Sequence, residues 1–204
     1  CMGFIYRRWI WLRRFRYRCG YGVHSPFAFD FLTGVVYERG EYYAYRELEA
    51  GRRLSFFRRG SHELKCRRFL FRLANYVHPV TIRLYGGLSR GETEYLTKGC
   101  SSAAVVKGGR NERAADACGT VPIGKELLVA GRDMNPEEWC KVALRLSVDG
   151  SVGLFPDIRV SEDAFHAWEK VKRLPQATVS FDLYDYGIVF YDRSKQRQDY
   201  MVNF

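Results

Sequence analysis

From residue 81 onward, short apolar runs alternate with stretches that carry apolar residues at helical spacing. The apolar runs predict strands at Thr81–Tyr85, Ala103–Lys107, Thr120–Ile123, Glu126–Ala130 and Ser151–Phe155. The stretches between them predict helices at Glu92–Lys98, Glu112–Cys118, Pro136–Leu146 and Glu162–Arg173. Alternating strands and helices are typical of βαβ units built on a parallel sheet. We therefore expect an α/β domain of three layers.

The end of the chain has a different pattern. Two β-rich runs, Thr178–Leu183 and Gly187–Tyr191, are separated only by Tyr184–Tyr186, and so short a connection predicts an antiparallel hairpin. The sequence therefore predicts a Rossmann-like sheet that is parallel except for an antiparallel last strand near Gly187–Tyr191.

Before residue 81 the pattern is helical. Ala28–Val36 and Tyr43–Arg53 predict two short helices, and a third begins near Ser61 and ends before Pro79. We expect a basic, aromatic-rich helical segment at residues 1–61, followed by the α/β domain at residues 62–204.

Charge is distributed unevenly along the chain. The 204 residues are 47% hydrophobic and 16% aromatic, enough for a packed core, and the net charge is +10. Residues 1–72 hold 16 Lys and Arg against 6 Asp and Glu, so the whole excess lies there. Residues 4–18 alternate aromatic and arginine clusters without an acid. They predict a helix packed on the domain with solvated arginines, a helix on an anionic membrane surface, or a contact with nucleic acid phosphates.

The six cysteines are widely spaced and form no pattern of metal ligands, so we expect no metal site and reduced thiols. No apolar run reaches the roughly 20 residues that a membrane span needs. Arginines also interrupt what would be the apolar part of a signal peptide. These features predict a cytoplasmic protein.

Two long segments carry a resemblance to a known family. They are GYGVHSPFAFDFLTGVVYERGEYYAYRELE, from Gly20, and FLFRLANYVHPVTIRLYGGLSRGETEYL, from Phe69. The chain resembles class I S-adenosylmethionine-dependent methyltransferases of a Bacteroidetes group that shares the phrase G-[IV]-H-S-P-F. The closing third, DGSVGLFPDIRVSEDAFHAWEKVK and VSFDLYDYGIVFYDRSKQRQDYMVNF, is similar to the same family. The likeness covers about residues 19–99 and 147–204.

The resemblance implies methyl transfer from S-adenosylmethionine to an acceptor that the sequence does not identify. It places the cofactor at a glycine-rich turn after the first strand, where a backbone without side chains permits close approach. The residues implied to bind the cofactor are Tyr85, Gly86, Gly87, Ser89, Gly91, Gly108 and Asp157. No residue is implied as catalytic.

Acids that the family uses to hold the cofactor are missing from this chain. Tyr85, Gly108, Ala130 and Pro156 stand where the resemblance expects carboxylates. A lost charge-assisted hydrogen bond costs about 1.5–3 kcal/mol, so two or three losses weaken binding by ~10³-fold or more. We expect weak or absent cofactor binding. The two functions that remain are a methyltransferase-like enzyme with a degenerate site and a non-catalytic scaffold or interaction protein, with an anionic partner at the N-terminus as one form of the latter.

Other motifs favour simpler interpretations. Gly87–Gly91 fits the G-x-S-x-G turn of serine hydrolases, but a glycine turn with Ser89 as a helix cap explains the pattern more simply. The only later histidine, His166, falls inside a predicted helix. The phrase from His24 to Phe27 is interpreted as a lid over the site or as a turn anchored by Pro26 and Phe27.

Overall fold

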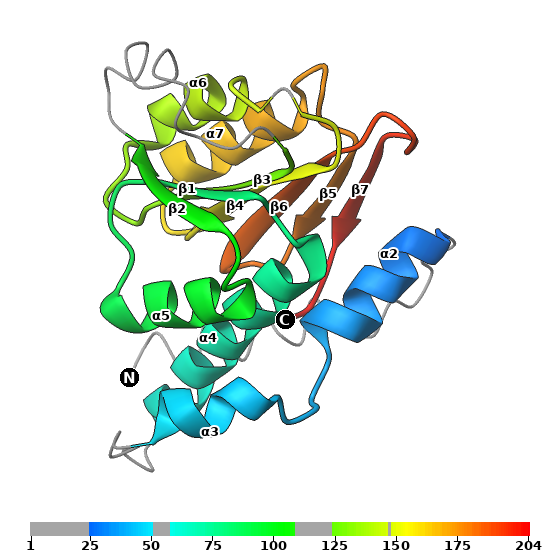
Figure 1. Ribbon diagram of the computed structural model, residues 1–204. Coiled ribbons are helices and arrows are strands. Elements are labelled where there is room, and N and C mark those ends of the chain that lie inside the picture. The colour runs from blue at the N-terminus through cyan, green and yellow to red at the C-terminus, as the bar shows by residue number, and fades with distance from the viewer. Residues whose placement is uncertain (1–24, 51–57, 109–123, 147) are drawn as a thin grey trace.

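The computed structural model describes residues 25–50, 58–108, 124–146 and 148–204, and these fold into three layers around one sheet (Figure 1). The strand order is β2-β1-β3-β4-β6-β5-β7. The strands are β1 (Thr81–Tyr85), β2 (Ala104–Gly108), β3 (Glu126–Ala130), β4 (Ser151–Pro156), β5 (Val179–Asp182), β6 (Tyr186–Tyr191) and β7 (Gln198–Met201).

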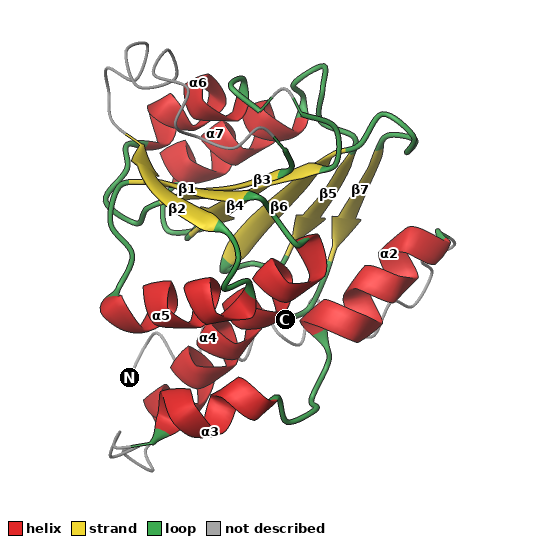
Figure 2. Ribbon diagram, viewed as in Figure 1, coloured by secondary structure: helices red, strands yellow, loops and turns green. Residues whose placement is uncertain are grey.

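Helices cover both faces of the sheet (Figure 2). They are α2 (Pro26–Phe31), the π-helix η2 (Leu32–Val36), α3 (Tyr43–Glu49), α4 (Arg58–Val77), α5 (Arg90–Gly99), the 3₁₀ turn η5 (Pro136–Glu138), α6 (Trp139–Ala143) and α7 (Glu162–Lys172). One core cluster joins α2, η2, α4 and α5 to the sheet, and a second joins α6 and α7 to the opposite face. Because both faces are covered, β1, β4, β5 and β6 are buried along their whole length.

Strand directions agree with the Rossmann-like fold predicted from the sequence. β1 pairs in parallel with β2 and β3, and β3 with β4. β6 runs antiparallel to both of its neighbours, β4 and β5. The three-layer α/β class is thereby confirmed, with its antiparallel strand near the C-terminus.

One further strand, β7, follows that antiparallel strand and pairs in parallel with β5. Its residues Gln198–Met201 are mostly exposed and do not alternate between apolar and polar types, which is why no sequence pattern predicts it. Hydrogen bonding to β5, rather than burial, makes this segment a strand.

The predicted element bounds agree closely with the structure at β1 and β3 and to within one or two residues elsewhere in the sheet. Two predicted helices are built differently. Ala28–Val36 is α2 continued by a π-helix, and Pro136–Leu146 is a 3₁₀ turn followed by the short helix α6. The predicted helices within residues 4–18 and 112–118, and the predicted strand at Thr120–Ile123, lie outside the described residues.

The N-terminal helices pack directly against the α/β layers. Phe31 of α2 contacts Phe181 and Phe190 in the sheet, with ring centroids 4.7 and 5.1 Å apart. Ser25 caps α2, its hydroxyl accepting the Ala28 N–H, and Phe27 packs edge-on to Phe190. These contacts favour the interpretation of the phrase from His24 to Phe27 as a turn anchored by Pro26 and Phe27. The division at residue 61 stays a prediction.

Two features are absent from the described residues, a membrane-spanning helix and a cluster of metal ligands. No helix among them is both long and apolar enough to cross a membrane. In the same residues, no group of three or more His, Cys, Asp and Glu side chains is arranged to hold a metal ion.

Candidate functional site

The candidate site lies at the carboxyl ends of β1, β3 and β4. After β1 the chain adds β2 on one side, and then returns to add β3 on the other side of β1. Such a reversal of strand order is a topological switch point, where parallel α/β sheets bind their ligands. The glycine-rich turn leaves the sheet at this point.

The turn Gly86–Gly91 leads from β1 into α5. Gly86 has φ +89°, a conformation that L side chains rarely adopt, so glycine is required there. Ser89 caps α5 in a capping box: its hydroxyl accepts the Glu92 N–H at 3.2 Å, and the Glu92 carboxylate accepts the Ser89 N–H at 3.0 Å. Ser89 is therefore a helix cap, as the simpler interpretation of the G-x-S-x-G pattern expects.

The segment Gly131–Asp133, which follows β3, lies directly on this turn. The Gly131 N–H donates to the Tyr85 carbonyl at 2.5 Å, and the Arg132 N–H donates to the Gly87 carbonyl at 3.1 Å. The Asp133 carboxylate accepts the Gly87 N–H at 2.6 Å. A Cβ on Gly131 would meet the Gly87 nitrogen at 2.4 Å. Hydrogen bonding between β1 and β3 thus continues past the strand ends and closes the crevice between them.

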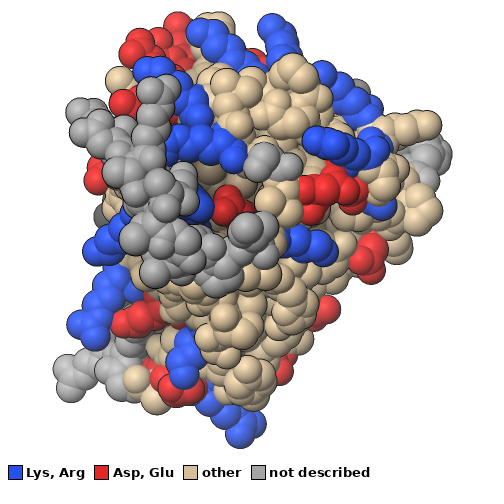
Figure 3. Space-filling view, turned by 45° about the horizontal axis from the view of Figure 1, so that its top comes forward, with Lys and Arg blue, Asp and Glu red and all other residues tan. Residues whose placement is uncertain are grey.

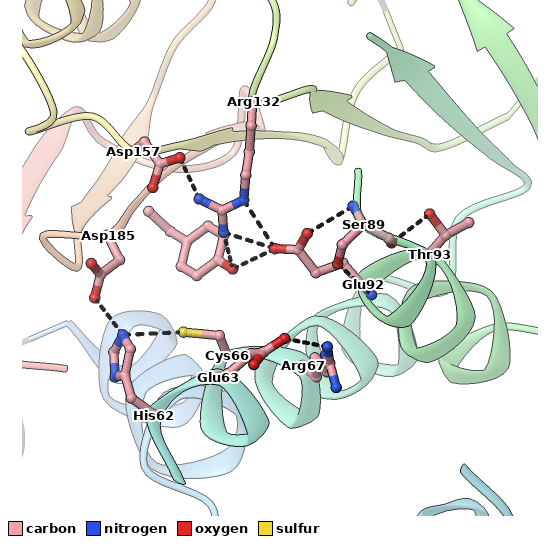
Figure 4. A network of polar contacts seen from close by, with 11 residues as sticks. His62, Glu63, Cys66, Arg67, Ser89, Glu92, Thr93, Arg132, Asp157 and Asp185 are labelled. Carbon is pink, nitrogen blue, oxygen red and sulfur yellow. Dashed lines mark hydrogen bonds and ion pairs between the residues drawn. The ribbon is translucent and has the colours of Figure 1, made fainter. Parts of the chain in front are cut away.

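Arg132 joins three elements at this edge of the sheet (Figure 4). Its Nη2 donates to Glu92 Oε1 at 2.7 Å and to the Tyr186 hydroxyl at 3.2 Å, and its Nη1 donates to the Asp157 carboxylate. The Glu92 side chain is 7% exposed, and that of Arg132 is 38% exposed. Loop, helix α5, the end of β4 and strand β6 are therefore held by one guanidinium.

The pKa shifts of Glu92 and Arg132 indicate that both groups are charged. Burial alone would raise the pKa of Glu92, but hydrogen bonds from Arg132 and Ser89 outweigh burial and hold that pKa below its usual range. Burial alone would lower the pKa of Arg132, but the bonds to Glu92 and Asp157 raise it. Both groups are therefore charged at neutral pH, as a permanent ion pair.

Asp157 is held in a conformation that is unusual for aspartate. It has φ +55°, and the nearby Tyr184 has φ +74°. The Asp157 N–H donates to the Asp185 carbonyl at 2.6 Å, which ties the end of β4 to the turn between β5 and β6. Backbone strain of this kind clusters at sites where the surrounding structure fixes a geometry.

A cysteine and a histidine lie beside the same network, on α4. His62 Nε2 is 3.2 Å from Asp185 Oδ2 and 3.5 Å from Cys66 Sγ (Figure 4). Burial, followed by the nearby charge of Asp185, raises the pKa of the Cys66 thiol to about 12. Because a thiol is nucleophilic only as the thiolate, Cys66 is an inert neutral group here despite its histidine neighbour.

Tyr85 takes up the space above Gly108, at the end of β2. A Cβ on Gly108 would meet the Tyr85 ring at 2.3 Å, so the aromatic ring lies against bare backbone. The Tyr85 hydroxyl accepts a hydrogen bond from Arg145 at 3.2 Å. Where the resemblance expects two acids, the chain therefore has an aromatic ring stacked on a glycine.

A cavity of about 270 Å³ remains on the α6 side of the closed crevice. Among the residues implied to bind a cofactor, Tyr85, Gly86 and Gly108 line it. Gly87 lies behind them under Asp133, while Ser89 and Gly91 belong to the start of α5. Asp157 is bound to Arg132 instead.

Arg132 and Glu92 were not predicted as a pair from the sequence. The sequence offered two signals: an acid at the third position of the helix that follows the glycine-rich turn, and an arginine shortly after a strand. Neither signal is specific by itself. Tyr186 was missed for the same reason, because a tyrosine that begins a buried strand is most often a core residue.

These residues do not fit the sulfonium cofactor that the family resemblance implies. A cationic cofactor with an ammonium group and ribose hydroxyls needs carboxylates that are open to it. The carboxylates of Glu92 and Asp157 are bound to Arg132, and that of Asp133 is bound to the glycine turn itself. Comparison of the chain with protein-family models and with curated proteins gives no match, so membership of the methyltransferase family stays a prediction from the sequence.

Proposed function

We propose that this chain is a non-catalytic protein with a methyltransferase-like fold, which acts as a binding or scaffolding module. The observation that carries the proposal is the closed crevice at the switch point. There, Gly131–Asp133 makes two backbone hydrogen bonds and one carboxylate bond to the residues that would cradle a cofactor.

Two further features support the proposal. Tyr85 and Gly108 stand where acids for the ammonium group and the ribose are expected, and neither carries a negative charge. The nearby buried carboxylate, Glu92, already has a counter-ion in Arg132. A ligand that needs the Glu92 carboxylate must displace Arg132, which donates to one oxygen of Glu92 through two nitrogens, and this displacement lowers the affinity.

The experiment is calorimetric titration of the folded protein with S-adenosylmethionine and with S-adenosylhomocysteine. We expect no binding at concentrations up to about 1 mM, which corresponds to less than about 4 kcal/mol of binding free energy. Binding of either compound in the micromolar range contradicts the proposal. The Gly87→Val variant is then the control, since a side chain at that position excludes a ligand from the turn.

A working methyltransferase is the second candidate, and the cavity lined by Tyr85, Gly86 and Gly108 favours it. Its volume of about 270 Å³ lies just under the roughly 300–1,000 Å³ of ordinary ligand pockets. Under this alternative, the wild type binds the cofactor in the titration and the Gly87→Val variant does not. The methyl acceptor would then be the next compound to identify.

A further inference from the structure

The cavity beside the closed crevice has a polar group of the chain itself at its edge. Asp133 lines the cavity and at the same time accepts the Gly87 N–H at 2.6 Å. A Cβ on Gly86 would meet the Asp133 carboxylate at 2.4 Å, and one on Gly87 would meet it at 3.3 Å. Two glycines thus make room for a carboxylate, so the space beside the Gly87 N–H suits a negatively charged group.

Further charged residues of the cavity lining come from η5, α6 and the turn after α6. Lys141 and Arg145 contribute positive charge, and Glu138 contributes one negative charge. While Asp133 is present, the charges of these four side chains balance. If Asp133 moves away, the described lining has a net positive charge that matches an anionic ligand.

The rest of the lining consists of Asn135, the backbone of Gly86 and Gly108, and three side chains with apolar surface. Tyr85, Met134 and Val142 contribute an aromatic ring, a thioether and a branched side chain. The Tyr85 ring is fixed because Gly108 lies under it and Arg145 bonds its hydroxyl. A flat apolar body fits the surface that these three side chains form.

We propose that this cavity binds a small aromatic carboxylate, whose carboxylate replaces that of Asp133 on the Gly87 N–H. Asp133 is an internal competitor for the position, and its side chain is exposed, so it moves aside without disturbing the core. Figure 3 shows Lys and Arg interspersed with Asp and Glu on the face turned toward the viewer.

The first test measures benzoate binding to the full chain by calorimetry, in the wild type and in Asp133→Ala. Removing an internal competitor that is present about 90% of the time lowers the dissociation constant about tenfold. We therefore expect about tenfold tighter binding of benzoate to the variant. Equal affinity in the two proteins, or no binding to either, overturns the proposal.

Asp149→Ala is the matched control. Asp149 is also exposed, and its carboxylate also accepts a backbone N–H, that of Arg193 at 2.7 Å, but it lies outside this cavity. We expect its benzoate affinity to equal that of the wild type. If Asp133→Ala does not fold, Asp133→Asn removes the charge but keeps an acceptor for the Gly87 N–H, so a gain in affinity smaller than that of Asp133→Ala is expected of it.

The second test separates charge from shape. Benzamide has the outline of benzoate without its charge, and we expect at least tenfold weaker binding to Asp133→Ala. Lys141→Gln in the same background lowers the affinity for benzoate and leaves that for benzamide unchanged. Equal binding of the two compounds overturns the proposal. Because benzoate is tested without any nucleoside, binding of S-adenosylmethionine by the wild type would contradict the proposed function and not this inference.

Discussion

Two arginines join separate elements of this molecule, one in each half of the fold. Arg68 on α4 holds α3 and the segment before it: it donates to both oxygens of Glu49, at 2.9 and 3.0 Å, and to Glu41 at 2.9 Å. Arg132 holds the carboxyl edge of the sheet through Glu92, Asp157 and Tyr186. The number of charged partners is the same. Their surroundings differ.

Burial separates the two arginine networks. The acidic partners of Arg68 have side chains that are 18% and 70% exposed, whereas those of Arg132 are 7% exposed at Glu92 and 36% exposed at Asp157, so the difference lies in Glu92. Water solvates Glu41 or Glu49 once the arginine is gone, but it reaches Glu92 poorly. The comparison teaches that an arginine links neighbouring elements in one region, whereas in the other region it is the counter-ion that a buried acid requires.

The largest expected effect comes from removing each arginine in turn. Arg132→Ala leaves Glu92 buried without a counter-ion and lowers the free energy of unfolding by about 3 kcal/mol, the lower end for broken buried pairs because Arg132 is partly exposed. Arg68→Ala lowers it by about 1.5 kcal/mol. Urea denaturation measures both. Equal losses would show that burial of the acid does not distinguish the two networks.

Acid sensitivity gives a middle-sized effect. The folded-state pKa of Glu92 is lower than its unfolded value, so its contribution is complete above the unfolded pKa and is lost as pH falls through the folded pKa. Stability of the wild type should therefore fall between about pH 5 and about pH 3, around the ordinary glutamate pKa of roughly 4.3. Glu92→Gln should flatten that fall in a series of thermal denaturations. Glu63→Gln, at an exposed acid of α4, is the control and should keep the wild-type slope.

The smallest expected effect concerns one phenol beside each arginine: Tyr186 at Arg132, and Tyr45, whose ring lies under the Arg68 guanidinium. Tyr186→Phe removes a hydroxyl that accepts from Arg132 at 3.2 Å, and Tyr45→Phe removes one that accepts from Arg72 at 3.4 Å. Each loss should cost about 1 kcal/mol; both residues are 1% exposed, so Tyr186→Phe is expected to be the larger only because its bond from arginine is shorter. Denaturant midpoints measured side by side decide the order. A larger loss for Tyr45→Phe would reverse the comparison.

Sequence patterns predicted the layers and most strands because burial on both faces leaves continuous apolar runs such as Thr81–Tyr85. They missed β7, whose formation depends on an unpaired edge of β5 that no local pattern reveals. The absence of acids at Tyr85 and Gly108 was also readable, since residue identity is enough for that.

The groups that occupy the crevice could not be predicted in the same way. Arg132, Glu92 and Tyr186 meet only when segments 40 and 54 residues apart in sequence come together, and each has an ordinary role when considered alone. Asp133 stands three residues after Ala130, where the resemblance expects an acid, but its bond to Gly87 follows from the close approach of two backbones at Gly131. Contacts of that kind are a product of topology.

The closed crevice also has a consequence for the order of folding. The bond between Gly87 and Asp133 joins residues 46 apart in sequence, and the contact between Glu92 and Tyr186 joins residues 94 apart. Contacts that close such long loops form late, after the local pairing of α4 with α5 is in place. Variants at this edge should therefore leave the refolding rate nearly unchanged and speed unfolding, so the crevice governs how long the native protein persists.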